Sequence, residues 1–482
     1  MENQTDFKIQ CSAPSKALIT GAYLITEPYY QGIVISCSAR FNTSMQVVYS
    51  GTDTVECTKI RCISRQMDEN DWVFKLKVNE DSMKVTTEDD KDDSVADGPA
   101  GYAQYILITF YTLLKSLKTI SSEKRNEFMQ KINEKLISEI VFEFVGDDAF
   151  YGHRMENGKL AKTGMGSSAT FIASFIGCLY VLIDNNTELS EEQLKEVHIL
   201  AQIANSVCQN KIGSGFDIAS AVYSSLVFKR FEPSSLYFLS QDLRNLNFEN
   251  VAMTYDVFYT DFDFIPKRFI LPKHFHLCMI SLSEGSDTKV MVKNLLKWSK
   301  DRRRVFTDSD EDEDLEQDSI FTCKEWDNAN QRGKAILDLF SKLNELEENE
   351  DYTQAIQDII DNNKTDSDVE KVINGLREQN NQYRLDLSCI TMLSGVQVEP
   401  MRATEILNEI LKQISQSVMI GVPGAGGDDA AYMLYLSTDS DQTEMRSTIK
   451  QELDKVNDNL KSQCCLLPIQ TNTKGPIRFE VS

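Results

Sequence analysis

The longest stretch of this chain without a charged residue runs from Thr163 to Ile183, and it limits the possible folds more than any other feature. A stretch of this length could cross a membrane if all of it were apolar. Its first part, however, reads TGMGSSAT and is small and hydroxylic, and only the part from Phe171 onward is mostly apolar. That part is shorter than the roughly 20 apolar residues that a bilayer-spanning helix needs. We therefore expect a buried helix with an unusually polar beginning, and no membrane span.

The beginning of this helix is suited to binding phosphate. In KTGMGSSAT, Gly164 and Gly166 remove side chains where a loop turns into the helix. The first turn of a helix exposes N–H groups that have no acceptor within the helix, here those of Ser167, Ser168 and Ala169. Such a terminus binds phosphate through these donors and through the positive end of the helix dipole. The two hydroxyls add donors for phosphate oxygens and ligands for a magnesium ion.

Three other interpretations compete with phosphate binding at this terminus. The pattern G-x-G-x-x-A, with Asp184 about 20 residues further on, resembles a dinucleotide-binding fingerprint. No apolar strand precedes the pattern, however, and the helix leaves no room for the second strand that should carry the acid. A P-loop needs G-x-x-x-x-G-K-[ST], which the chain does not contain. Glycines and serines that merely pack a helix end remain an alternative for the segment taken alone.

The net charge argues against two classes of partner. Seventy-four acidic and fifty basic residues give the 482-residue chain a formal charge of −24. A field of this sign repels nucleic-acid backbones and anionic lipid surfaces. We therefore expect small-molecule partners and no nucleic acid. If a substrate is an anion, its site must gather local Lys, Arg or amide donors.

Cysteine and histidine usage favours a reducing compartment and predicts no metal site of its own. The eleven cysteines include no C-x-x-C pair, which fits neither a disulfide framework nor a zinc site. Among the histidines only His274 and His276 lie close together, and no neighbouring Cys or acid completes a ligand set. The N-terminus, MENQTDFKIQ, has neither the basic nor the apolar region of a secretory signal. We expect a cytoplasmic protein with reduced thiols.

The order of patterns along the chain predicts an α+β protein of two domains. Length favours two or three domains, at about 150 residues each. Strand patterns dominate the first part of the chain: VISCSARF, MQVVYS, VECTKIRCI and WVFKLKV. Ser190 and Gln193 predict a capping box that begins an amphipathic helix, and that helix ends in NKIGSGFD. We place the first domain at residues 1–230 and the second at residues 231–482.

The second domain mixes strands and helices around an acidic run. Strands are expected near LCMISL, SVMIGV and CCLLPIQ, and helices near residues 290–298, 336–346 and 401–414. The run TDSDEDEDLEQDS, residues 307–319, cannot bury enough apolar surface to order itself, so we interpret it as a solvated loop. Ser309 in this loop is a hypothetical target of an acid-directed kinase, and a plain insertion is the alternative.

Six segments together resemble one family of kinases. They are SAPSKALITGAYLIT, KTGMGSSAT, QNKIGSGFDIASAVYSS, GSDTKVMVKNLLKW, SGVQVEP and PGAGGDDA. The order of the glycine-rich segments resembles the GHMP kinase superfamily, and the whole set resembles the phosphomevalonate kinases of fungi and plants. The resemblance spans residues 10–430, and KIGSGFD together with the order of segments is its most specific part. It implies a first domain like ribosomal S5 domain 2, a ferredoxin-like second domain and an active site between them.

The resemblance also implies an activity. It implies transfer of the ATP γ-phosphate to the phosphate of (R)-5-phosphomevalonate, which yields (R)-5-diphosphomevalonate in the mevalonate pathway of isoprenoid synthesis, with ATP and Mg²⁺ required. Two alternatives stay open. One is another small-molecule kinase of the superfamily, such as mevalonate kinase, and the other is a catalytically silent sensor with the same fold.

Roles for individual residues follow from the same resemblance. Lys16 and Asp217 match the catalytic pair. The residues implied to hold the ATP phosphates are Lys162, Thr163, Gly164, Met165, Gly166, Ser167, Ser168 and Ala169, with Ser168 also a magnesium ligand. Those implied to bind the second substrate are Lys211, Ser214, Gly424, Gly426 and Gly427. Weaker candidates are Lys229, Arg230, Lys289 and Lys293.

Chemistry limits what Asp217 can do. An aspartate in this position is usually assigned as a base that deprotonates an alcohol, but the acceptor implied here is a phosphate whose second pKa is about 6. Such a group is already largely ionised at neutral pH. We therefore predict that Asp217 chiefly orients Lys16, which would neutralise charge on the transferring group. A helix-capping role for Asp217 is compatible with this one.

The sequence departs from the family pattern at a few positions. Ser15 replaces a common glycine, Met165 replaces the usual leucine, and Asp428 takes a position that is often apolar. Some relatives use a glutamate on the helix before the aspartate turn as a second magnesium ligand. The stretch before the turn reads IANSVCQN here and has no carboxylate. We expect the metal to be held mainly by phosphates, water and Ser168.

Overall fold

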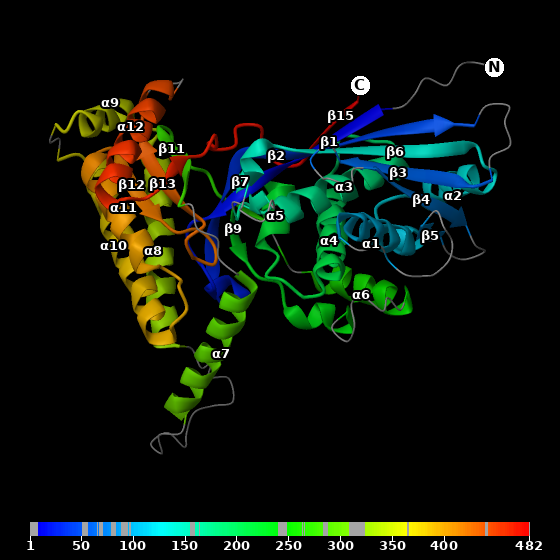
Figure 1. Cartoon of the computed structure of the whole chain (residues 1–482), viewed down its shortest axis with the longest axis horizontal. Helices are drawn as coiled ribbons and strands as arrows, with labels where there is room; N and C mark the ends of the chain where they lie inside the picture. The colour runs from blue at the N-terminus through cyan, green and yellow to red at the C-terminus, as the bar shows by residue number, and fades with distance from the viewer. Residues whose placement is uncertain are drawn as a thin grey trace.

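The computed structural model describes residues 8–50, 56–64, 66, 71–78, 83–87, 95, 98–154, 160–162, 164–239, 248–262, 264, 266–282, 288–307, 323–363, 366–438 and 442–481. They form an elongated α+β molecule with one main sheet toward each end and helices packed against both (Figure 1). The sequence prediction of a two-domain α+β fold is confirmed. The acidic run from residue 308 to residue 319, with Ser309, lies outside the described residues.

The larger sheet is mostly antiparallel. Its strands follow the order β10, β9, β2, β6, β3, β4, β5, and β1 pairs with both β2 and β15. Only the neighbours β3 and β6 run parallel in the described part of the sheet. The bounds are β1 (Lys8–Leu18), β2 (Gln31–Tyr49), β3 (Thr58–Ser64), β4 (Asp71–Val78), β5 (Met83–Thr87), β6 (Ile137–Gly146), β9 (Leu226–Lys229), β10 (Lys267–Arg268) and β15 (Arg478–Val481). A division of the chain near residue 230 stays a prediction, and β10 and β15 would then join this sheet from the second part.

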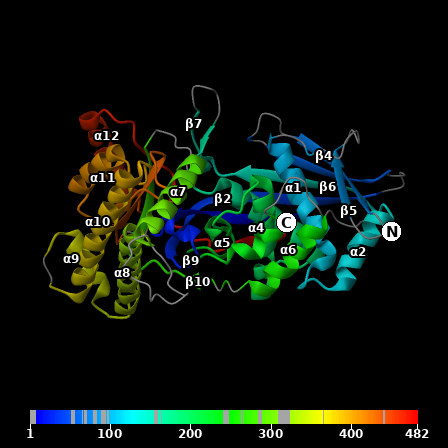
Figure 2. The same ribbon diagram turned by 90° about the horizontal axis from the view of Figure 1, so that it is seen from below.

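Six helices cover one face of the larger sheet (Figure 2). They are α1 (Gly98–Leu113), α2 (Ser122–Asn133), α3 (Ser167–Asp184), α4 (Glu191–Gln209), α5 (Phe216–Tyr223) and α6 (Phe248–Asp261). Helix α3 packs directly on β1 and β2 and is enclosed by α4 and α5. It is long and apolar enough to cross a membrane, but 78% of it is buried inside the protein. The expected buried helix with a polar beginning is confirmed.

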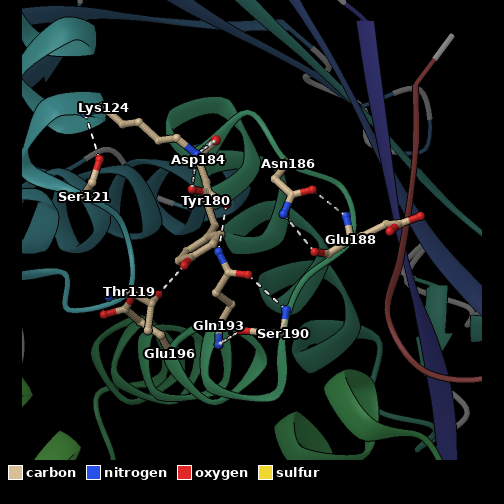
Figure 3. Close-up of polar contacts among 10 residues, drawn as sticks. All are labelled: Thr119, Ser121, Lys124, Tyr180, Asp184, Asn186, Glu188, Ser190, Gln193 and Glu196. Carbon is tan, nitrogen blue, oxygen red and sulfur yellow. Dashed lines mark hydrogen bonds and ion pairs between the residues drawn. The ribbon is translucent and has the colours of Figure 1, made fainter.

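A polar network fixes the end of α3 that is remote from its glycine turn (Figure 3). Asp184, in the last turn, accepts hydrogen bonds from Lys124 Nζ at 2.8 Å and from Gln193 Nε2 at 2.8 Å. Gln193 belongs to the predicted capping box, which is confirmed: Ser190 Oγ accepts from Gln193 N, and Gln193 Oε1 accepts from Ser190 N. Three helices are thereby joined at one corner, and the opposite end of α3 is left facing the centre of the molecule.

The smaller sheet lies between two pairs of helices. Its strands follow the order β12, β13, β11, β14, and all are antiparallel. Residues alternate along β11, so Leu277 and Met279 pack in the core that includes α8 and α10, whereas Cys278 and Ile280 pack against α11 and α12. The bounds are β11 (Phe275–Ser281), β12 (Ser417–Gly421), β13 (Ala430–Leu436), β14 (Cys465–Leu466), α7 (Thr288–Thr307), α8 (Lys324–Leu346), α9 (Tyr352–Ile360), α10 (Asp368–Ser394), α11 (Met401–Gln413) and α12 (Thr443–Leu460).

Short elements complete the described part of the chain. Strands β7 (Tyr151–Arg154) and β8 (Leu160–Lys162) pair only with each other, and β8 leads into the glycine turn before α3. A strand therefore does precede that turn, contrary to the sequence interpretation. It has three residues and lies outside the large sheet, so it does not provide the parallel βαβ unit of a dinucleotide-binding fold. The remaining turns of 3₁₀ helix are Leu24–Thr26, Leu114–Ser116, Asp148–Phe150 and Pro233–Leu239.

The end of β1 and the turn that follows it connect the two sheets. The Gly424 N–H, in the turn between β12 and β13, donates to Leu18 O at 3.0 Å. Tyr383 Oη on α10 accepts from Gly21 N at 2.9 Å, and Tyr432 Oη on β13 donates to Ile19 O at 3.2 Å. These contacts place the first and third glycine-rich segments side by side.

Candidate active site

A cavity of about 400 Å³ opens between the two sheets, and all three glycine-rich segments contribute to its wall. Its other lining residues come from α4, α5, α7, the turn before α5, residues 25–26 and Arg230 after β9. Among the predicted site residues, those that line it are Lys16, Gly164, Met165, Gly166, Ser167, Ser168, Ala169, Lys211, Ser214, Asp217, Gly424 and Gly426. Segments that are far apart in the sequence thus meet in one space large enough for small-molecule ligands.

The glycine turn before α3 opens the helix toward this cavity. Gly166 is the N-cap residue and has φ +81°, a left-handed conformation that glycine adopts without strain. A Cβ at this position would lie 3.2 Å from Lys16 Cε, so glycine also allows the lysine side chain to approach. No side chain caps the helix, and the first-turn N–H groups at Ser167, Ser168 and Ala169 have no acceptor within it. The turn therefore presents amide donors and two hydroxyls to the cavity.

Lys16 reaches this turn from the large sheet. It lies on β1 directly after a register shift between Pro14 and Ser15, and its side chain is only 8% exposed. Its Nζ donates to Gly164 O at 2.9 Å and lies 4.8 Å from the centre of the Phe216 ring. Burial lowers the pKa of Lys16, and the nearby negative charge of Asp217 acts in the opposite direction. The cation is therefore held in place by a carbonyl and a ring beside the open helix terminus.

Asp217 faces the same space from the first turn of α5. The helix follows Gly215, which has φ +90°, and a Cβ there would lie 2.7 Å from Phe231 Cε1. Asp217 Oδ1 accepts from Ile218 N at 3.0 Å, which is the capping contact that its position allows. The structure gives Asp217 no ion pair with Lys16, whose hydrogen bond goes to Gly164 O instead. The two charges influence each other across the cavity without direct contact.

A second group of cations lines the side of the cavity near the KIGSG turn. Lys211 and Ser214 lie on this turn, and Arg230 lies directly after β9. Arg230 Nη2 donates to Gly213 O at 2.9 Å, and Nη1 donates to Thr26 O. This guanidinium therefore ties the KIGSG turn to the segment after β1. Lys229, its neighbour, is exposed and does not line the cavity.

The third glycine-rich segment forms the turn between β12 and β13, as the sequence also allowed. Gly424 and Gly426 line the cavity, whereas Gly427 does not. The N–H groups of all three are already hydrogen bonded, to Leu18 O, Pro423 O and Gln397 O respectively. In the described structure these amides are not open donors, unlike those of α3. Their binding of substrate stays a prediction.

Some predicted site residues cannot be placed. Thr163 lies outside the described residues, and so do the side chains of Lys162 and Lys289. Lys293 is described on α7 and lines a separate, neighbouring cavity.

Sequence reasoning missed several lining residues. Asn205 and Gln209 face the cavity from α4, one turn apart, and Gln209 Nε2 donates to Asn205 Oδ1 at 2.6 Å. Both lie in the stretch IANSVCQN at the end of α4, where some relatives have a glutamate as a second magnesium ligand and this chain has no carboxylate. Val292 and Leu296 reach the cavity from α7. Helix α4 is amphipathic and carries other polar residues, such as Gln202 and Ser206, so no local signal distinguished Asn205 and Gln209.

The donor set suits a hard cation only in part. Within the described ranges, no three His, Cys, Asp or Glu side chains gather as a metal cluster. Ser168 and Asp217 offer a hydroxyl and a carboxylate in the same cavity, and oxygen ligands of this kind, completed by phosphates and water, are those that Mg²⁺ prefers.

Comparison with known proteins agrees with this geometry. Residues 139–225, which contain α3, the KIGSG turn and α5, match the family model described as the GHMP kinases N terminal domain. The phosphomevalonate kinase of Candida albicans is 27% identical over 428 residues, which cover 88% of this chain and 89% of that protein. The peroxisomal phosphomevalonate kinase of Arabidopsis thaliana is 25% identical and covers 89% of this chain and 90% of its own length.

Solved structures share the fold at low sequence identity. The Lin0012 protein of Listeria innocua has a TM-score of 0.59 and 14% identity, with 98% of this chain and 99% of that one covered. The phosphomevalonate kinase of Streptococcus pneumoniae, solved with phosphomevalonate and AMPPNP, has a TM-score of 0.55 and 13% identity over 96% of this chain and 98% of its own. The chain is therefore similar to fungal and plant phosphomevalonate kinases over 88–89% of its length, contains a match to the GHMP kinase N-terminal domain, and shares its fold with these solved structures.

Proposed function

We propose that this protein transfers the γ-phosphate of ATP to the phosphate of (R)-5-phosphomevalonate and releases ADP and (R)-5-diphosphomevalonate. An acceptor phosphate oxygen forms a bond to the γ-phosphorus, and the bond to the bridging oxygen breaks, so that its electron pair leaves on ADP. The observation that carries the proposal is the meeting of the open α3 terminus, Lys16 and Asp217 in one cavity. Relatives named phosphomevalonate kinase that match about nine-tenths of the chain support the choice of acceptor.

The α3 terminus would hold the triphosphate of ATP. Its free amide groups and the hydroxyls of Ser167 and Ser168 would donate hydrogen bonds to the phosphate oxygens. The positive end of the helix dipole would also favour the negative charge of the ligand. Lys16 would then stabilise the charge that moves from the γ-phosphate to ADP. Phosphoryl transfer asks a protein mainly for such positioning and electrostatic stabilisation.

Asp217 would act through the charge on Lys16. Burial favours the neutral amine, and the carboxylate of Asp217 opposes this by raising the pKa of Lys16. An acceptor phosphate with a pKa of about 6 carries little proton to remove at neutral pH, so a general base has little to contribute. In this proposal Asp217 keeps its neighbour positively charged and helps to shape the site.

The second substrate would lie toward the KIGSG turn. Lys211, Ser214 and Arg230 supply cationic and hydroxyl donors to the same cavity as the α3 terminus. Such a cluster meets the need for local donors in a chain of charge −24. We also propose that Ser168 and Asp217 hold Mg²⁺ together with the phosphates; the ion would supply neutralising charge to the phosphate oxygens.

We further propose a cytoplasmic location. All eleven cysteines are free thiols, as expected in a reducing compartment.

An assay that couples ADP release to NADH oxidation tests the function. We expect turnover with 5-phosphomevalonate and little with mevalonate, and ³¹P NMR should show the two coupled signals of a diphosphate ester. The variant Lys16→Met serves as the control for contaminating ATPase, because it removes the cation and keeps an unbranched side chain of similar length. Preference for mevalonate would support the mevalonate kinase alternative, and absence of ATP turnover with either acceptor would support a silent sensor.

A further inference from the structure

Helix α7 carries a concentration of positive charge that the active cavity does not use. Its sequence, TKVMVKNLLKWSKDRRRVFT, contains seven basic residues and one acidic residue. The chain as a whole has a charge of −24, so the net charge of this helix has the opposite sign to that of the chain. The helix projects from the body of the molecule beside the gap between the two sheets (Figure 1).

One face of α7 is attached to the protein. Leu295 is 1% exposed and Ser299 is completely buried. One turn further on, Arg302 forms an ion pair of 2.7 Å with Glu325 in the first turn of α8, and its guanidinium lies 5.7 Å from the centre of the Trp298 ring. These contacts fix which way the helix faces.

The opposite face presents a row of lysines to solvent. Lys293, Lys297 and Lys300 follow one another at intervals of four and three residues, which places them on one side of a helix. All three are exposed, and none forms an ion pair with a residue that the structure describes. We call these three residues the lysine face of α7. In a protein with many more acids than bases, three neighbouring lysines without partners leave a local positive surface.

The lysine face borders the active cavity. Its three residues line a cavity of about 340 Å³ together with Leu296 and Asp301. Leu296 also lines the active cavity, as does Val292 one turn earlier on the same helix. The two cavities therefore share Leu296 in their walls, which places the lysine face beside the active cavity.

We propose that the lysine face of α7 captures phosphate-bearing substrates and guides them into the active cavity. This inference rests on the proposed function, because it needs substrates that are polyanions. The overall charge of −24 repels such molecules, and a local surface of opposite sign at the entrance offsets this repulsion. The lysines act on the encounter and do not touch the transferred phosphate, so the face should affect association more than chemistry or dissociation.

Stopped-flow binding of a fluorescent N-methylanthraniloyl derivative of ATP to the full chain tests the proposal. The triple variant Lys293→Gln/Lys297→Gln/Lys300→Gln should lower the association rate constant by about threefold to tenfold at low ionic strength. The dissociation rate constant should change by less than about twofold. Salt screens exposed charges over about 10 Å at 0.1 M and over about 3 Å at 1 M, so the two proteins should converge as salt is added.

A matched control separates local from overall charge. The variant Lys342→Gln/Lys412→Gln/Lys450→Gln removes the same number of exposed lysines from α8, α11 and α12, none of which lines either cavity. It should behave like the unmodified protein. Equal association rates and equal salt dependence in all three proteins, or an equal loss in both variants, would overturn the inference and leave the proposed function intact. An unmodified protein that binds no nucleotide would instead overturn the proposed function.

Discussion

Lys16 is a buried cation beside a carboxylate that it does not contact. Its side chain is 8% exposed and donates to Gly164 O, while the charge of Asp217 raises its pKa against the effect of burial. The position of Asp217 fits either a catalytic base or an electrostatic partner of Lys16. These two roles predict different changes in activity when the carboxylate of Asp217 is removed.

The variant Asp217→Asn should lose activity, and the loss should grow as pH rises. Without the carboxylate, burial is opposed only by the smaller influence of Cys37, so the pKa of Lys16 falls further and the amine loses its proton at lower pH than in the unmodified protein. We expect kcat to fall by about 10²–10³-fold near neutral pH, as for other lost electrostatic contributions. The measurement is kcat/KM between about pH 6 and about pH 10, with the falling limb displaced to lower pH.

A control and an opposite outcome accompany this experiment. Asp429 lines the same cavity, whereas the charges that raise the pKa of Lys16 are those of Asp217 and Cys37, so Asp429→Asn should leave the position of the limb unchanged. Recovery of Asp217→Asn activity at high pH would mean that hydroxide replaces a missing base, and the electrostatic role would then be wrong.

His198 should make the protein sensitive to acid. It is 1% exposed, neither ring nitrogen has a hydrogen-bond partner among the residues that the structure describes, and the rings of Phe262 and Phe264 lie 5.0 and 5.2 Å away. Burial lowers its pKa from 6.5 to about 3. Between these values the unfolded chain binds a proton that the folded protein excludes, so stability is lost as pH falls below about 6.5. This group alone should cost about 2 kcal/mol at about pH 5.

Urea denaturation at about pH 7 and about pH 5 measures this cost. In His198→Phe an aromatic ring of similar size remains and the titration is removed, so the free energy of unfolding should fall by about 2 kcal/mol less between the two pH values than in the unmodified protein. His274 is partly exposed, and His274→Phe should retain most of the acid sensitivity. An equal fall in the unmodified protein and in His198→Phe would contradict the assignment.

Residues in motifs were the predictable part of the site. Ser168 and Asp217 each stand two residues after a glycine that precedes a helix, Lys16 was indicated by the resemblance to the kinase family, and all three line the cavity. Asn205 and Val292 carry no such local sign. Their positions depend on how α4 and α7 pack, and that packing involves partners distant in the sequence.

At the scale of elements, the β12–β13 turn illustrates how one glycine can be indispensable and its neighbour not. Gly424 and Gly426 both have positive φ, at +68° and +79°. A Cβ on Gly426 would lie 2.0 Å from Val398 O, whereas one on Gly424 would meet nothing within 4 Å. Of these two glycines, only Gly426 is therefore pressed against the loop after α10.

Alanine substitution should separate these two glycines. Gly426→Ala combines an unfavourable backbone with a steric clash and should destabilise the protein by about 2–5 kcal/mol. Gly424→Ala carries the backbone cost alone, about 1–2 kcal/mol. Denaturant unfolding of both variants measures the difference, and equal losses would show that the close approach to Val398 does not matter.

Helices and strands with a clear hydrophobic period could be predicted from the sequence, whereas polar residues within a strand were misleading. The sequence predicted two strands, VISCSARF and MQVVYS, where the structure has the single strand β2 of 19 residues. The polar residues Asn42, Thr43 and Ser44 lie between these two patterns. In the fold Thr43 is buried on the strand, and its Oγ1 shares a hydrogen bond of 2.7 Å with Ser174 Oγ on α3. That partner lies 131 residues away, so nothing local signals it.

At the scale of the whole molecule, activity depends on how the two sheets are held relative to each other. The α3 terminus and Lys16 belong to the larger sheet and its helices, whereas Val292 and the β12–β13 turn belong to the other part. Hydrogen bonds at the end of β1 cross this junction, and among them the bond from Gly21 N to Tyr383 Oη is buried. Glycine-rich patterns predicted each wall of the cavity, but the contacts that bring the walls together come from residues such as Tyr383 that no motif distinguishes.

Loss of this junction bond should therefore reduce both stability and activity. Tyr383→Phe keeps the ring and leaves the buried Gly21 N–H without an acceptor, which should cost about 1–3 kcal/mol. Tyr352→Phe is the matched control, because its hydroxyl donates to Lys273 O at 3.1 Å within the second part, away from the junction. Both variants should be less stable to denaturant, but only Tyr383→Phe should lower kcat/KM at a temperature where both remain folded. If the two variants lose activity equally, or if neither does, the relative placement of the sheets is not set by this contact, and the rest of the interface must fix the cavity without it.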